Sequence, residues 1–205
     1  LLHYQNEEYS QAIEAYKLVA TQYPGSEEAK LALRDLKSIY TDINKVDEFA
    51  AVVSSLPGDI HFDVNEQDSL TYIAAERIFT RKQIPQAKES FTKYLQSFPS
   101  GAYREYAHYY LARIGQEQND EEAVLTHTAR ILELNGSRFT EEALVMRAEL
   151  LYKRQQYAEA LPFYKQLKAH AGSAGHRLTA QIGIIRSAYK TKNDADVIHA
   201  ATSLL

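Results

Sequence analysis

Histidine is the residue type in this 205-residue sequence best suited to metal binding or to proton transfer at neutral pH. The helical zinc motif needs two histidines one turn apart with a glutamate beside the first, and the sequence contains no such motif. The histidines are spread over the whole chain, at His3, His61, His108, His127, His170, His176 and His199. The absence of cysteine also excludes thiolate metal sites and disulfide bonds. We predict no metal site and no cofactor.

Other catalytic signatures are absent from the sequence as well. It contains no Gly-x-Ser-x-Gly nucleophile motif, no phosphate-binding loop and no dinucleotide-binding glycine cluster. The glycine-rich segment 172–175 follows a predicted helix rather than a strand, and we interpret it as a turn. Adjacent carboxylates such as Glu141 and Glu142 fall at predicted helix starts, where negative charge favours the helix dipole. The sequence therefore predicts a protein that is not an enzyme and has no catalytic residue.

Tyrosine, unlike histidine, is concentrated in one segment of the sequence. The segment Ser97–Ile114 follows a Pro-Ser-Gly turn with four tyrosines in eight positions, Tyr103, Tyr106, Tyr109 and Tyr110. Such a cluster could bind a ligand, or it could pack one helix against another. A single binding site would need the pattern only once, whereas helix packing in a repeated structure would make the pattern recur along the chain.

The pattern does recur. Pro99 is followed by Ala107 eight residues later and by Leu111 twelve residues later, and Pro24 is followed at the same distances by Ala32 and Leu36. A further set of positions repeats at steps of 37, 38, 36, 37 and 37 residues: Ala12, Phe49, Ala87, Ala123, Ala160 and Val197. We therefore interpret the chain as a repeat protein with a period of about 37 residues.

Each repeat is predicted to form two helices. Apolar and small residues recur three and four positions apart, as in the segment 29–40, and Pro or Gly lies between successive repeats. Short polar turns between the two helices of a repeat are predicted at 6–8, 81–83, 119–120, 154–156 and 193–194. Four alanines are expected to be buried where the two helices of a repeat meet: Ala12, Ala87, Ala123 and Ala160. Pro162 lies inside a predicted helix and is expected to bend it.

This arrangement resembles the tetratricopeptide repeat, which has Ala-x-x-x-aromatic in its second helix and proline twelve residues after the alanine, as in Ala87, Phe91 and Pro99. The opening Tyr23-Pro24-Gly25-Ser26-Glu27-Glu28-Ala29 is similar to bacterial periplasmic and outer-membrane-lipoprotein members of that family. The resemblance implies an all-α fold, a right-handed α-α superhelix of about six helix pairs forming a single solenoid over 1–205. Its repeats would be 1–25 (partial), 26–62, 63–100, 101–136, 137–173 and 174–205.

In such a fold most of the tyrosines serve packing. Ala107 and Leu111 are expected to face the partner helix of their repeat. Tyr106 and Tyr110 are expected to pack against the preceding repeat, whereas Tyr103 and Tyr109 are expected to be partly exposed. His127 occupies the aromatic position of its repeat and is interpreted as a packed ring.

The resemblance also implies that the first helices of the repeats line a concave groove. Aromatic residues recur sixteen positions after the turn, and charged or polar residues precede them on the same face. The rings could seal successive repeats together, or they could form a ladder that holds a partner peptide or helix. The protein-binding candidates are Tyr72, Glu76, Phe79, His108, Glu149, Tyr152, Arg186 and Tyr189. The Lys and Asn clamp by which related co-chaperones grip a C-terminal carboxylate is absent, because its positions hold Arg34, Ser38, Tyr72, Glu76, His108 and Ala112.

Composition narrows the set of partners. The net charge of −4 and the lack of clustered Lys and Arg speak against nucleic acid. No apolar run approaches the roughly 20 residues that span a bilayer, so direct membrane insertion is not expected. Neither Leu1–Tyr4 nor Ala200–Leu205 resembles a polar cap, so we expect a piece of a longer array that self-associates through uncapped ends.

The predicted function is a non-catalytic scaffold that binds other proteins or peptides through its groove or its ends. Assembly of the bacterial envelope is the expected setting, with a location in the periplasm or at the outer membrane, and the cytoplasm as the alternative. The alternative function is a recognition arm of a larger enzyme or signalling protein whose catalytic domain lies outside this chain.

Overall fold

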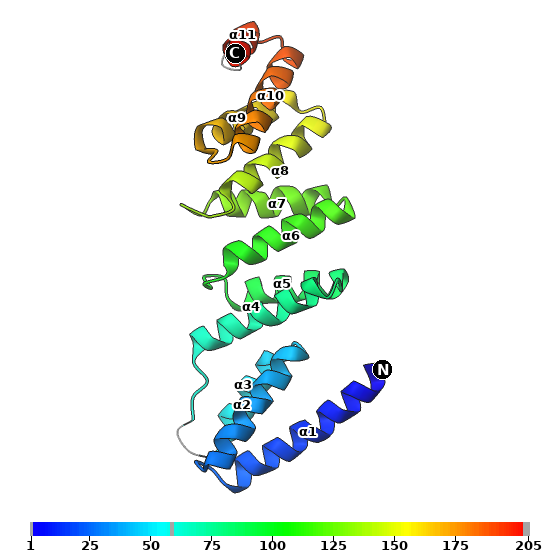
Figure 1. Ribbon diagram of the computed structural model, residues 1–205, viewed down its shortest axis with the longest axis vertical. Helices are drawn as coiled ribbons and strands as arrows, with labels where there is room; N and C mark the ends of the chain where they lie inside the picture. Colours follow the sequence, from blue (N-terminus) through cyan, green and yellow to red (C-terminus); the bar gives the residue numbers. More distant parts are fainter. Residues whose placement is uncertain (1, 58–59, 203–205) are drawn as a thin grey trace. The chain divides into compact units, whose positions relative to one another are not determined.

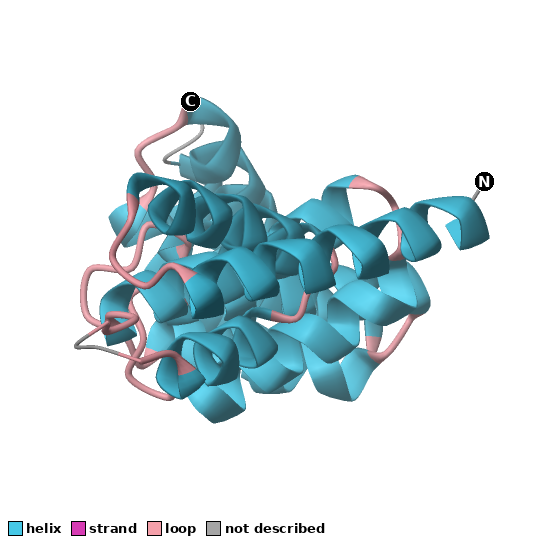
Figure 2. Ribbon diagram, turned by 90° about the horizontal axis from the view of Figure 1, so that it is seen from below, coloured by secondary structure: helices cyan, strands magenta, loops and turns pink. Residues whose placement is uncertain are grey.

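The computed structural model describes residues 2–57 and 60–202, with side chains from residue 8 onward. In these ranges the chain forms eleven α-helices and no β-strand (Figure 2). The helices are labelled in Figure 1: α1 (Leu2–Gln22), α2 (Glu27–Asp42), α3 (Val46–Ser55), α4 (Val64–Thr80), α5 (Ile84–Ser97), α6 (Arg104–Gln118), α7 (Glu121–Leu132), α8 (Thr140–Lys153), α9 (Tyr157–His170), α10 (Ala174–Lys190) and α11 (Asp194–Thr202).

The helices pack as consecutive pairs. The chain divides into two compact units, 1–107 and 108–205, which are described separately here. In the first unit α2 packs on α3 and α4 on α5, and in the second α8 packs on α9 and α10 on α11. We call α2, α4, α6, α8 and α10 the first helices, and α3, α5, α7, α9 and α11 the second helices. Successive first helices also contact each other within a unit, α2 with α4 and α8 with α10. This layered stacking is the α-solenoid arrangement that the sequence predicted.

The turn inside each helix pair has the same backbone conformation. One non-glycine residue per turn has a positive φ between 55° and 62°, at Asn44, Lys82, Asn119, Gln155 and Lys192. These positions are 38, 37, 36 and 37 residues apart, so the repeat is a property of the backbone as well as of the sequence. The left-handed residue ends the first helix and reverses the chain within a few residues.

Side-chain caps fix where several of the helices begin. Ser26 accepts a hydrogen bond from the Ala29 N–H at the start of α2, and Ser173 does the same for the His176 N–H at the start of α10. Asp63 caps α4 and Asp120 caps α7. These oxygens satisfy N–H groups that have no partner within the helix, and they fix the register of the apolar face.

Two details of the sequence analysis were wrong. The turn expected at 6–8 does not form, because α1 continues from Leu2 to Gln22 without a glycine or proline to interrupt it. Among the four alanines, Ala87 and Ala160 are fully buried, but Ala12 and Ala123 are only half-buried. Pro162 lies inside α9, which continues on both sides of it.

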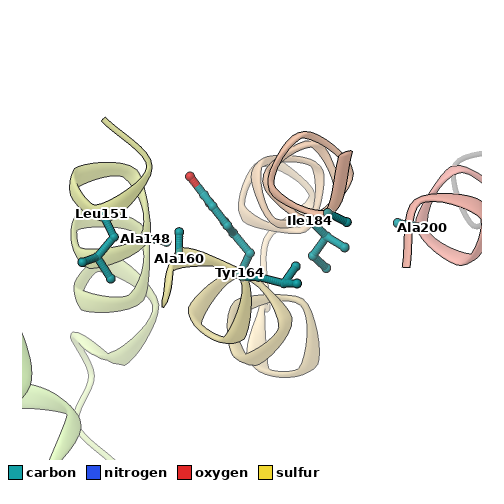
Figure 3. Close-up of a cluster of buried hydrophobic side chains, with 8 residues drawn as sticks. Ala148, Leu151, Ala160, Tyr164, Ile184 and Ala200 are labelled. Carbon is teal, nitrogen blue, oxygen red and sulfur yellow. The ribbon is translucent and has the colours of Figure 1, made fainter. Parts of the chain in front are cut away.

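The core of the second unit illustrates how the pairs are joined. Small and branched residues of α8, α9, α10 and α11 form one buried cluster with Tyr164. Figure 3 shows Ala148, Leu151 and Ala160 on one side of Tyr164 and Ile184 on the other, with Ala200 beyond Ile184. Tyr164 and Ala160 have no exposed surface. The alanines allow the helix axes to approach, and the tyrosine fills the space between three helices. Leu204 and Leu205, where self-association was expected, lie outside the described residues.

Candidate functional site

The predicted groove residues of the first unit pack into an aromatic cluster. Tyr72 of α4 is only 4% exposed, and its ring stacks on that of Tyr103 at 4.5 Å with an interplanar angle of 8°. Its hydroxyl donates a hydrogen bond of 2.6 Å to Oε1 of Glu76, one turn later. Phe79 is half-buried, with its ring 6.5 Å from that of Phe91 in α5. Tyr72 and Phe79 therefore join α4 to its neighbours.

Among the tyrosines of Ser97–Ile114, Tyr106 packs against the preceding helix pair, as predicted. The Tyr106 ring lies 5.6 Å from Tyr72, in the preceding helix pair. Tyr103 stacks on Tyr72 and is half-buried, so it is partly exposed, as expected. Tyr109 stacks on Phe139 at 4.1 Å, at the entrance to the following pair, and contacts Tyr110. Aromatic stacking between pairs therefore accounts for the cluster.

His108 meets a histidine that was expected only to pack. Its Nδ1 lies 3.0 Å from Nδ1 of His127 in α7, and the two rings are 5.3 Å apart. One nitrogen must donate and the other accept, so this contact requires at least one neutral imidazole. The pair links α6 to α7 in the position that Tyr72 and Phe91 occupy between α4 and α5.

Glu149, Tyr152 and Arg186 converge in the second unit, although they come from two different first helices. The guanidinium of Arg186 bonds to the Glu149 carboxylate, and its central carbon lies 4.0 Å from the centre of the Tyr152 ring. The hydroxyl of Tyr164, from α9, donates to Oε1 of Glu149 at 2.7 Å. Burial and the bond to Glu149 raise the pKa of Tyr164, which therefore remains a donor. This network joins α8, α9 and α10.

Among the members of the aromatic series whose side chains the structure describes, Tyr189 has the most exposed ring. Its side chain is 72% exposed at the end of α10, whereas Tyr152 at the corresponding position of α8 is half-buried. Leu178 and Ile182 on the same helix are also exposed, at 49% and 47%. Of the eight predicted site residues, then, seven contact residues of their own or a neighbouring helix pair, and the Tyr189 side chain is mostly exposed.

Cavities between successive first helices are the feature that the sequence analysis missed. In the second unit a cavity of about 310 Å³ lies between α6 and α8. It is lined by Gly115, Gln116, Asn119, Glu121, Val124, Met146, Glu149, Leu150 and Lys153. In the first unit a cavity of about 230 Å³ between α2 and α4 has an apolar floor that includes Leu33, Phe49 and Phe62. The sequence signal that could have predicted the cavity in the second unit is Gly115, which stands where other repeats have an aromatic residue.

The described residues contain no cluster of three or more His, Asp or Glu side chains that could hold a metal ion. Among these residues there is also no helix that is long and apolar enough to cross a bilayer.

The stacked pairs and the left-handed turn in each pair define an all-helical repeat protein, an α-solenoid. Residues 142–173, which span most of α8 and all of α9, match the tetratricopeptide repeat family, so the predicted resemblance is confirmed. The chain is similar in fold to the structure solved in the functional characterization of PilF from Pseudomonas aeruginosa, with a TM-score of 0.50. The identity is 18%, over 96% of this chain and 92% of that one, so this likeness establishes the fold alone. The sequence matches no curated protein.

A tetratricopeptide repeat is typically a module that binds proteins or peptides rather than a catalyst. The family match therefore supports a protein-interaction scaffold as the general class of function.

Proposed function

We propose that this chain is a non-catalytic scaffold that binds a peptide or helix of a partner protein along its first helices. The observation that carries the proposal is that a cavity lies between two successive first helices in each unit. Both cavities have an apolar floor, and both have charged side chains at their edges, Lys37 and Glu66 in the first unit and Lys153 and Glu121 in the second. An apolar floor with a polar rim is the usual composition of a protein-binding surface.

The proposed setting is the bacterial envelope, in the periplasm or at the outer membrane. It rests on the opening motif Tyr23–Ala29 and its similarity to envelope members of the family. Fractionation of cells that produce the natural protein tests this location directly, and recovery in the cytoplasm would contradict it.

Site-specific photocrosslinking tests the binding surface. A photoreactive amino acid is placed at Gln116, on the rim of the cavity between α6 and α8, and in a matched protein at Gln166, which is exposed on the second helix α9. After exposure to envelope extract, the captured protein is identified and its complex is rebuilt from purified components. We expect a crosslink from Gln116 and not from Gln166. Efficient crosslinking from Gln166 alone would show that the first helices are not the binding surface.

A further inference from the structure

Gly115 leaves a space that a ring fills in the neighbouring pair. The corresponding position holds Phe79 in α4, Tyr152 in α8 and Tyr189 in α10. In α8 the Tyr152 ring lies against Arg186 of the next first helix. In α6 the position is Gly115, and Glu149, which corresponds to Arg186, lines the cavity of about 310 Å³. The cavity therefore lies where the next interface holds an aromatic ring.

The close approach of α6 to α7 explains why the chain supplies no side chain of its own at this position. A Cβ atom on Gly115 would lie 3.1 Å from the backbone oxygen of Asp120 and 3.1 Å from Cγ2 of Val124. Both distances are shorter than ordinary van der Waals contact, so a larger residue would force the two helices apart.

The lining of the cavity is suited to an uncharged apolar group. Val124, Met146 and Leu150 provide apolar surface. The two carboxylates that line it are neutralised by neighbouring cations. Glu121 bonds to Nε of Arg154 at 2.7 Å, and Glu149 bonds to Arg186. Lys153, the cation that lines the cavity, is paired as well, with its Nζ 3.6 Å from Oε1 of Glu121. An unpaired charge on the ligand would find no free counter-charge there and would lose its hydration.

The size and the rim of the cavity point to a peptide side chain. An apolar cavity of about 150 Å³ can hold benzene, so 310 Å³ accommodates a Leu, Met or Phe side chain with part of its backbone. Gln116 and Asn119 lie at the edge and are exposed, and their amides can both donate to and accept from a peptide backbone.

We propose that the Gly115 cavity binds one large, uncharged apolar side chain of a partner peptide, with Gln116 bonding to the peptide backbone beside it. This inference rests on the proposed function, because it names the chemistry that the first-helix surface would recognise. The occupant is a segment of another protein with a single Leu, Met or Phe anchor.

Met146 offers a direct probe, because it is the only methionine in the sequence and it lines the cavity. The full chain is labelled with ¹³C at the methionine methyl group, and Met146→Leu identifies its signal. The probes are short acetylated and amidated Ser-Gly peptides with one central Leu, Met or Phe, and the control peptide has a central Ser. We expect a saturable shift of the Met146 signal with the three apolar peptides and no shift with the Ser peptide.

Three variants locate the binding within the cavity. Leu150→Phe places a ring in the space and should weaken peptide binding by about tenfold or more, equivalent to the loss of one buried apolar group. Gln116→Ala keeps the space and should weaken binding by about threefold, through the loss of one hydrogen bond. Glu117→Ala changes an exposed neighbour that does not line the cavity, and binding should be unchanged. Circular dichroism tests whether each variant is folded. If Leu150→Phe does not fold, Gln116→Ala still tests the proposal.

The outcomes separate this inference from the proposed function. Equal shifts with the Leu and Ser peptides, no shift with any peptide, or equal binding by Gln116→Ala and Glu117→Ala would each overturn the assignment of the cavity. A partner crosslinked at Gln116 would then still support the scaffold. Saturable binding of the apolar peptides without any crosslinked partner would support the cavity and contradict the proposed function.

Discussion

A buried carboxylate holds the loop that leads from α5 to α6. Asp68, which is 8% exposed on α4, accepts a hydrogen bond of 2.5 Å from the Tyr94 hydroxyl and one of 2.7 Å from the Ala102 N–H. The Tyr94 oxygen in turn accepts from the Tyr103 N–H at 2.9 Å. Burial and the Asp68 bond raise the pKa of Tyr94, so the hydroxyl remains a donor. Glu141, at the matching position of α8, similarly accepts from the Gly172 N–H.

Gly101 is required by the tight packing of this loop, and its replacement gives the first prediction. A Cβ atom there would lie 2.5 Å from the Tyr94 hydroxyl and 2.9 Å from Oδ1 of Asp68. Gly101→Ala should therefore lower the free energy of unfolding by about 1–3 kcal/mol in urea denaturation. Gly175→Ala is the control, because its Cβ would meet nothing closer than 4.0 Å, and in helix α10 it should be neutral or stabilising. Equal stability of the two variants would refute the steric argument.

Glu141 gives a prediction of pH dependence. The Gly172 N–H, and then the side chain of His176, hold the pKa of the Glu141 carboxyl below its usual value. Because the folded pKa is lower than the unfolded one, the stabilisation is complete above the unfolded value and is lost as the pH falls through the folded value. Glu141→Gln should therefore lower the melting temperature at neutral pH and make little difference at an acid pH below the folded pKa of Glu141.

The exposed Glu117 on α6 provides the control for this effect. Glu117→Gln should leave the melting temperature close to that of the natural chain at both pH values. A deficit of Glu141→Gln that stays constant down to acid pH would mean that the carboxylate charge contributes nothing.

At the scale of the helix pair, the left-handed turn residue is a repeated source of strain. Gln155 has φ 61° between α8 and α9, a conformation that costs a non-glycine residue about 1–2 kcal/mol. Gln155→Gly should remove this strain and raise the free energy of unfolding by about 0.5–1 kcal/mol, after the greater flexibility of glycine in the unfolded chain is subtracted. Thermal or urea denaturation measures the change.

The next residue supplies the matched control for Gln155. Gln156 has φ −84°, so Gln156→Gly gains nothing in the folded state and should destabilise the protein by about 0.5–1 kcal/mol. Opposite signs for two adjacent substitutions are the expected result. The same sign for both would indicate that the turn is not strained.

At the scale of the whole molecule, a stack of repeats should confine the effect of a destabilising substitution to the neighbouring helices. Ala160 is fully buried where α8, α9 and α10 meet, so Ala160→Glu buries a charge in the core of the second unit. Because each repeat packs only on its neighbours, amide hydrogen exchange should accelerate in α8, α9 and α10 and remain unchanged in α2, α3, α4 and α5. Exposed Ala158 on α9 is the control, and Ala158→Glu should alter neither region. Uniform acceleration along the chain would indicate a single cooperative unit.

The sequence by itself determined the helical repeat. Periodic small residues such as Ala87 and Ala160, and the turn residues between them, repeat at a nearly constant interval, and local spacing is enough to specify helices, turns and register. The packing role of Tyr106 could also be predicted, because a residue that recurs in a stack of helices faces a neighbour in the stack. The interval could not reveal that α1 continues through 6–8, since polar residues are compatible with both a turn and a helix.

Only the tertiary structure decided which of the predicted groove residues are exposed and which contact other parts of the protein. Glu149, Tyr152 and Arg186 share one face in the sequence pattern, but whether they meet a partner or each other depends on the distance between α8 and α10. The histidine contact and the Asp68 network likewise join residues that lie far apart in the sequence. Gly115 was visible as a gap in the aromatic series, but a missing side chain becomes a cavity only when the surrounding helices fail to close on it. Helix spacing is set by all the side chains at an interface together, and no local pattern contains that information.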